Sequence, residues 1–282
     1  MPLTKVLITV KTYPTISTKY EELVCTAGFL ENGNWVRIYP IQFRKKAYSE
    51  QYSKYQWVEI DLVKNKDDKR PESYRPVSHE TQIKILGSIE PDGGSWDERR
   101  EIVLNKVYTD LSGLIAEAKD INISTSLAVF KPSEILGIKV KPSEREWSKE
   151  KLARLQQLNI FESAQTEKPV VVKKLPYEFS YVFKDIGGKQ ATLMIEDWEL
   201  GQLYWNCFKR AKNKGADDAE AELKACSDVK YKYFDDFAKT KDIHLYLGTT
   251  QKYHFMSPNP FLVIGTFHPK FQKNIPTQGS LF

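Results

Sequence analysis

The sequence predicts an α+β protein with a β-rich, barrel-like N-terminal part, a helical middle, an α+β C-terminal part and a flexible C-terminal tail. Residues 1–90 hold short apolar runs separated by turn residues, and from Trp96 the apolar spacing becomes helical. Later the order is two strands, two helices and two strands, which favours α+β packing over a doubly wound parallel sheet. The predicted parts are residues 1–90, 91–165, 170–269 and 270–282.

The N-terminal part is predicted to be a set of strands. Asn32-Gly33 between two apolar runs is a strong hairpin signal, because both residues tolerate a positive φ. Further on, Val58, Ile60 and Leu62 alternate with polar or large residues, which indicates a strand with one buried face. The predicted strands are residues 5–10, 22–29, 35–41, 55–63 and 81–89, and the polar stretch 65–76 is predicted to be a loop.

The remaining elements follow from changes in apolar spacing. After the break at Asp92-Gly93-Gly94-Ser95, apolar residues recur at helical intervals. Gly187-Gly188 marks the turn of a second hairpin. The predicted elements are a helix over 96–118, a strand over 135–140, a helix over 147–158, a hairpin over 177–183 and 190–195, helices over 197–212 and 217–237, and a closing strand pair over 244–249 and 261–267.

Composition sets bounds on location and partners. The formal net charge of +5, from 42 Lys and Arg against 37 Asp and Glu, permits nucleic-acid binding without requiring it. The three widely spaced cysteines and four histidines offer little for a disulfide framework or a structural zinc site. The chain shows no signal peptide and no apolar stretch of membrane-spanning length, so a soluble cytoplasmic protein without a membrane partner is expected.

The tail ends in Gln278-Gly279-Ser280-Leu281-Phe282. This pentapeptide resembles the motif by which bacterial polymerases, repair proteins and clamp loaders bind the β sliding clamp: Gln, any residue, Ser or Asp, Leu, Phe. The resemblance covers five residues and implies the clamp as partner, with Gln278, Leu281 and Phe282 as the clamp-binding residues. Each of the two apolar side chains would contribute roughly 1.5–3 kcal/mol on full burial. The alternative is a chance Leu-Phe sequence that packs on the body.

A candidate nucleic-acid surface lies in the first hairpin. Trp35, Arg37 and Tyr39 alternate along one strand, and the next turn is basic. Aromatic rings stack on bases and cations follow phosphates, so this mixture suits a single strand. The alternative is a partly buried aromatic face beside a solvated basic turn. The candidate nucleic-acid-binding residues are Trp35, Arg37, Tyr39, Arg44, Lys45 and Lys46.

The same stretch, Trp35-Val36-Arg37-Ile38-Tyr39-Pro40, is similar to a Trp-Val-Arg-x-x-Pro strand in a group of uncharacterised bacterial proteins with OB-like or PUA-like barrels. The resemblance covers about the first 65 residues. It implies a small barrel of the nucleic-acid-binding type and no particular activity.

Two weaker patterns are candidates for chemistry. Glu196, Asp197 and Glu199 lie at a predicted helix start, where three carboxylates could bind Mg²⁺ as catalytic residues of a nuclease. The alternative is that these acids stabilise the helix N-terminus. Near the closing strands, the histidines and hydroxyls form a candidate acid–base site, against the alternative of scattered surface histidines; its residues are His244, Thr249, Thr250, His254 and His268.

These observations give three functional hypotheses. The leading one is a DNA-associated accessory or processing protein, recruited by the sliding clamp in replication, repair or phage defence, that binds nucleic acid and needs no cofactor. The second is a metal-dependent nuclease or DNA-modifying enzyme that uses Mg²⁺. The third is a protein-interaction module, which would show no salt-dependent nucleic-acid binding.

Overall fold

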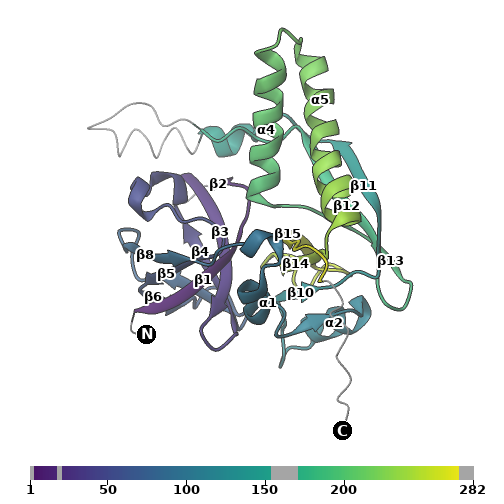
Figure 1. Ribbon diagram of the computed structural model, residues 1–282. Coiled ribbons are helices and arrows are strands. Elements are labelled where there is room, and N and C mark those ends of the chain that lie inside the picture. Colours follow the sequence, from purple (N-terminus) through teal and green to yellow (C-terminus); the bar gives the residue numbers. More distant parts are fainter. Residues whose placement is uncertain (1–2, 18–20, 154–170, 273–282) are drawn as a thin grey trace, which may run out of the picture.

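The computed structural model describes residues 3–17, 21–153 and 171–272. The predicted α+β class is confirmed, because these residues form three sheets with helices beside them (Figure 1). The pentapeptide at 278–282 lies outside the described residues. Within the described ranges, no helix is long and apolar enough to cross a membrane.

The N-terminal part is a sheet of eight described strands that curls into a half-barrel, which confirms the barrel-like prediction. Its order is β6-β7-β4-β3-β1-β5-β8, with β2 paired to β3. Because side chains alternate along a strand, Val58, Ile60 and Leu62 enter one apolar core, as predicted. The strands are β1 (Thr4–Lys11), β2 (Thr15–Ser17), β3 (Glu21–Leu30), β4 (Trp35–Ile41), β5 (Gln56–Ile60), β6 (Leu62–Lys64), β7 (Ser73–Pro76) and β8 (Ile83–Ser88).

The stretch 65–76 departs from its predicted loop structure. It contains β7, which pairs in parallel with β4, and the side chains of Asp68, Arg70 and Ser73 are buried. Residues 65–72 contain no strand or helix, as predicted, and the prediction was wrong for residues 73–76, which form β7. The loop is not simply solvated, because the Asp68 and Arg70 charges pair with each other inside the protein.

The predicted continuous helix over 96–118 is also wrong. Two short helices occupy this region, α1 (Asp97–Val103) and α2 (Leu111–Lys119), with β9 (Val107–Tyr108) between them. The second helix begins anew because the Asp110 side chain accepts hydrogen bonds from the backbone N–H groups of Ser112 and Gly113. β9 pairs in parallel with β10 (Leu127–Phe130), so the middle part contributes to a sheet.

The C-terminal elements follow the predicted order, and α4 and α5 form a helical hairpin that projects from the sheets (Figure 1). Asp197 caps the first of these helices and Asp217 forms a capping box at the second. Residues 149–153 are helical, residues 147–148 are described but not helical, and residues 154–158 of the predicted helix lie outside the described residues. The elements are β11 (Glu134–Pro142), β12 (Tyr177–Lys184), β13 (Gln190–Met194), α4 (Trp198–Lys212), α5 (Asp218–Lys230), the π-helix η4 (Tyr231–Ala238), β14 (His244–Thr249) and β15 (Phe261–Phe267).

An apolar core joins the two halves of the chain. The first half is the N-terminal sheet, β1 to β8, and the second half holds the elements from β9 to β15. Val10 and Phe29 from the first sheet pack in one cluster with Val129, Tyr246 and Phe267 from the sheet of order β15-β14-β10-β9. The two halves therefore pack directly against each other, and a site between them has walls from both.

The predicted tail begins in an anchored position. The Lys270 backbone N–H donates to the carbonyl of Gly94 (2.8 Å), and its ammonium donates to the carbonyl of Gly93 (2.7 Å). Arg100 donates in turn to the carbonyl of Lys270 (2.8 Å). Residue 270 is thus part of the folded body, and from residue 273 onward the predicted tail lies outside the described residues.

Candidate nucleic-acid interface

The turn between β3 and β4 places Trp35 at the junction of the two halves. Gly33 has a φ of 79°, the left-handed conformation that glycine adopts easily. The Leu30 N–H donates to the carbonyl of Asn34 (2.9 Å), which closes the hairpin. Trp35 then pairs across the strands with Phe29, their ring centroids 4.0 Å apart, and meets Tyr246 edge-on at 5.9 Å.

A cavity of about 430 Å³ opens beside this hairpin. Its size lies in the range of small-molecule sites, which favour the boundaries between packed units. Trp35 and Tyr74 come from the first sheet and Tyr108 from β9, so both halves contribute aromatic walls. Among the described residues that line it, Glu72 is the acid and Lys106 the base.

Two of the rings that line this cavity, Tyr74 and Tyr108, have cations and a hydrogen-bond partner beside them. The Tyr108 hydroxyl donates to Glu117 (2.6 Å), and the Lys106 ammonium lies 4.6 Å from the Tyr108 ring centroid. The Lys64 ammonium lies 4.4 Å from the Tyr74 ring centroid. These contacts fix the planes of the rings and bring two cations to the edge of an aromatic cavity, which is an arrangement that suits a base and its backbone.

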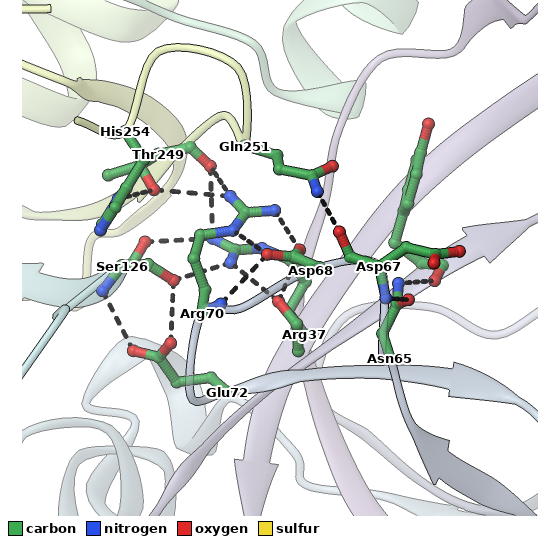
Figure 2. Close-up of polar contacts among 12 residues, drawn as sticks. Arg37, Asn65, Asp67, Asp68, Arg70, Glu72, Ser126, Thr249, Gln251 and His254 are labelled. Atoms are coloured by element: carbon green, nitrogen blue, oxygen red, sulfur yellow. Dashed lines mark hydrogen bonds and ion pairs between the residues drawn. The ribbon is translucent and has the colours of Figure 1, made fainter. Parts of the chain in front are cut away.

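Behind the cavity lies a buried polar network, in which Arg37 links the two halves (Figure 2). Its guanidinium donates to the Ser126 hydroxyl (2.7 Å), the Ser126 carbonyl (3.0 Å) and the Thr249 carbonyl (3.4 Å). The Arg37 residue is only 2% exposed. Arg37 is therefore an internal connector between halves rather than a surface group.

A second arginine in the network has its own carboxylate. Arg70 forms a two-point ion pair with Asp68, with Nε to Oδ1 at 2.8 Å, and also donates to the Thr249 carbonyl. Ser73 donates to Asp68 (2.8 Å). Burial raises the pKa of Asp68, but the hydrogen bonds and charge of Arg70 outweigh it and hold the pKa below its usual value. Asp68 therefore stays ionised.

Glu72 connects this network to the cavity. Its carboxylate accepts from the Ser126 N–H (3.1 Å) and the Ser126 hydroxyl (2.9 Å), while Glu72 itself lines the cavity. Because an ionised carboxylate offers about four acceptor positions, Glu72 keeps acceptor capacity for a ligand. The Ser126 hydroxyl lies between the Arg37 donor and the Glu72 acceptor, so the positions of all three depend on one another (Figure 2).

The structure distributes the predicted nucleic-acid-binding residues unevenly. Trp35 lines the cavity, Tyr39 is 37% exposed, and Arg44 and Lys45 are exposed on the 3₁₀ turn η1 (Phe43–Lys45). The expectation that Arg37 lies on an accessible face does not hold, because Ser126 and Thr249 of the second half cover that face. Lys46 is half-buried and donates to the backbone carbonyls of His79 and Thr81, at 3.1 and 2.7 Å.

The predicted catalytic acids are also separated. Asp197 and Glu199 both contact the Lys54 ammonium, at 2.9 Å each, whereas Glu196 is half-buried and burial raises its pKa. Burial would lower the pKa of Lys54, but the two carboxylates raise it, so the ammonium form persists. Lys54 thus lies where a divalent cation held by these two acids would lie. Among the described residues, no group of three or more His, Cys, Asp or Glu side chains is arranged to hold a metal ion.

A second lysine lies beside this cluster. The Lys11 ammonium is 4.4 Å from the Phe43 ring centroid and 5.1 Å from that of Trp198, and it donates to the Tyr52 carbonyl (3.1 Å). Burial and the neighbouring Lys54 charge lower the pKa of Lys11 to about 8. The structure therefore supplies Lys54 as the lysine partner of the acids, which the sequence alone did not identify.

The histidines do not form one site. His254 lies between the hydroxyls of Thr249 (2.8 Å) and Ser124 (3.0 Å), whereas His268 stacks on Phe237 with ring centroids 3.6 Å apart. Burial lowers the pKa of His244 to about 4 and that of His268 to about 3, so both are neutral at pH 7.

Sequence reasoning missed Glu72, Lys54 and the Arg70–Asp68 pair. Arg37 and Thr249, which meet in the buried network, are 212 positions apart in the chain. Local periodicity carries no signal for such pairs. The density of charges and turn residues in 65–76 could have indicated the Arg70–Asp68 pair, but the same pattern also fits an ordinary surface loop.

Comparisons with known proteins give family matches without an activity. A family model described as "Domain of unknown function (DUF8758)" matches residues 2–105, and one described as "Domain of unknown function (DUF8757)" matches residues 108–282. The chain matches no curated protein. A solved structure titled "Structure of murine DNA binding protein bound with ds DNA" is 10% identical over 97% of this chain and 98% of that chain, with a TM-score of 0.32. A likeness at this TM-score carries no argument about fold or function.

Proposed function

The chain belongs to the family described as "Domain of unknown function (DUF8757)", and because that description assigns no activity, we propose from the site itself that the protein binds nucleic acid and is recruited to DNA by the sliding clamp. The observation that carries the nucleic-acid part is β4, which begins at the aromatic cavity and leads into an exposed basic turn. The recruitment part is supported by Gln278, Leu281 and Phe282 of the pentapeptide, whose structure lies outside the described residues.

The spacing of these two features suits a strand of several nucleotides. The seven residues of β4 separate Trp35 from the basic turn by roughly 20 Å, at about 3.3 Å per residue. Stacked nucleotides advance about 3.4 Å each along one strand. The Arg37 side chain between these two ends is covered by Ser126 and Thr249. A strand that contacts both Trp35 and the turn of Arg44 and Lys45 therefore has to pass around this covered stretch, which needs more than about six nucleotides.

This proposal makes a charge-dependent prediction. We expect the full chain to bind a labelled single-stranded oligonucleotide with an affinity that falls as salt rises, because cation–phosphate contacts release counterions. The double variant Arg44→Glu, Lys45→Glu should bind at least about tenfold more weakly, and the slope of log affinity against log salt should become shallower by about 1.4, since each phosphate contact to a single strand contributes about 0.7. Fluorescence anisotropy at several salt concentrations measures both.

A matched control variant shows whether weaker binding comes from lost contacts at the basic turn or from the lower net charge of the protein. Lys139→Glu, Lys141→Glu carries the same charge change on exposed positions of β11, in a different sheet. It should keep the wild-type salt slope. Equal slopes in all three proteins would contradict binding through the turn. Running the titration with DNA, RNA and duplex of one sequence identifies the preferred form.

The second hypothesis, a metal-dependent nuclease or DNA-modifying enzyme, stays a prediction, and it requires that the acids release Lys54. A Mg²⁺ ion bound by Asp197 and Glu199 would have to displace the Lys54 ammonium, which contacts both carboxylates. The third alternative, a protein-interaction module, predicts no salt-dependent oligonucleotide binding, so the same titration distinguishes it.

A further inference from the structure

We propose that the cavity between the two halves binds a single nucleobase, with aromatic rings against its face and Glu72 accepting hydrogen bonds from its edge. This inference deepens the proposed nucleic-acid binding and rests on it. The base can belong to a free nucleoside or nucleotide, or to an unstacked position in a strand. The shared chemistry is a flat heterocycle with N–H donors on one edge.

The size and the aromatic lining of the cavity favour a flat ring. Its volume of about 430 Å³ exceeds that of one base, which leaves room for the sugar at the opening. Trp35, Tyr74 and Tyr108 line it. Stacking on such rings contributes roughly 1–3 kcal/mol per base and tolerates any base, because every base has a π-face.

The charge of the lining disfavours a phosphate inside the cavity. Glu72 and Lys106 oppose each other in sign, and Lys106 is 70% exposed at the side chain. A phosphate needs several donors and no adjacent carboxylate. The carboxylate therefore favours a neutral ring inside, while Lys106 and Lys64 are placed to meet the backbone that leaves the cavity.

The preference for one kind of base follows from the hydrogen bonds that Glu72 can accept from the edge of that base. Its two oxygens already accept from Ser126, which fixes the carboxylate in place while acceptor positions remain. A fixed carboxylate pairs best with two adjacent N–H donors, which guanine presents on its Watson–Crick edge. Uracil and thymine present one donor between two carbonyl oxygens, which a carboxylate repels. Guanine should therefore bind most tightly and uracil or thymine most weakly.

The test uses the full chain and nucleosides, which lack phosphate and so do not depend on the basic turn. We expect guanosine to bind with a Kd of roughly 10 µM to 1 mM, as its size permits, and uridine at least about tenfold more weakly. Asn105→Trp, at an exposed lining position, should fill the cavity and weaken guanosine binding at least about tenfold. Asn122→Trp is the matched control at an exposed position outside the lining, and Glu72→Gln should reduce the preference over uridine.

Two further measurements identify the source of the base and separate the proposals. An oligo-dT with one central dG that binds more tightly than pure oligo-dT, with the gain lost in Asn105→Trp, shows a base within a strand. Equal binding of both oligonucleotides, with guanosine still bound, shows a free nucleoside. The double variant Arg44→Glu, Lys45→Glu should leave guanosine binding unchanged. A failure of strand binding can therefore be distinguished from a failure of the nucleobase site. Absence of binding for all four nucleosides, or binding that Asn105→Trp leaves unchanged, would overturn the inference.

Discussion

Replacing Asp197 by alanine should lower the free energy of unfolding by at least about 3 kcal/mol, because it leaves the Lys54 ammonium without its buried partner. The Asp197 side chain is fully buried and that of Lys54 is 5% exposed, so water cannot replace the lost contact. Asp197 also caps α4, accepting from the Glu199 N–H (3.3 Å), and loss of a cap costs about 1 kcal/mol. Urea denaturation followed by circular dichroism measures the change.

Two companion variants separate these contributions. Asp197→Asn removes the charge and keeps a good N-cap residue, so it should retain the cap and lose the ion pair. Glu199→Ala removes the other carboxylate of Lys54, but that side chain is 52% exposed, so the expected cost is at most about 1 kcal/mol. If Asp197→Ala and Glu199→Ala destabilise the protein equally, the buried pair does not have the role assigned to it.

Asp68→Ala should destabilise the protein by a similar amount, about 3–5 kcal/mol at pH 7. It leaves the Arg70 guanidinium, whose side chain is 8% exposed, with the Arg37 guanidinium nearby and no carboxylate in contact among the described residues. The hydroxyl of Ser73 loses its acceptor as well. Asp67→Ala is the matched control, because the Asp67 side chain is exposed and its contact with Gln251 is through the backbone carbonyl.

The same pair gives a pH dependence of definite sign. The folded protein holds the pKa of Asp68 below its usual value of about 3.8, so the unfolded chain takes up the proton first as the pH falls. The stability that Asp68 contributes is therefore present above about pH 3.8 and is lost below it. Unfolding curves should show the gap between wild type and Asp68→Ala narrowing only below that pH. A gap that narrows between pH 7 and 5 would contradict the assignment.

The sequence predicted well those elements whose signals are local. The first hairpin, the Tyr177–Lys184 and Gln190–Met194 pair, α4, and the closing strands each have a clear apolar period or a turn glycine, and each is present. Local signals failed where a tertiary contact decides the structure. β9 interrupts a helical pattern because it pairs with β10, and β7 forms inside a charged stretch because β4 offers it a free edge.

The candidate site was predictable only in part, for the same reason. Trp35 was predicted because it alternates with Arg37 and Tyr39 along one strand, and in the structure it lines the cavity. Arg37 was assigned to a surface because strand alternation indicates which face a residue is on but not what covers that face. Glu72, Ser126 and Thr249, which surround Arg37, come from segments far apart in the chain.

Binding to a purified bacterial β sliding clamp tests most directly the proposal that the clamp recruits this protein to DNA. The comparison is between the full chain, a chain ending at residue 277, and the full-length double variant Leu281→Ala, Phe282→Ala, measured by surface plasmon resonance. Loss of two apolar side chains that would be buried on binding to the clamp should weaken binding at least about a hundredfold. Only the full wild-type chain should bind. Equal binding by all three proteins, or binding by none, would contradict the proposal.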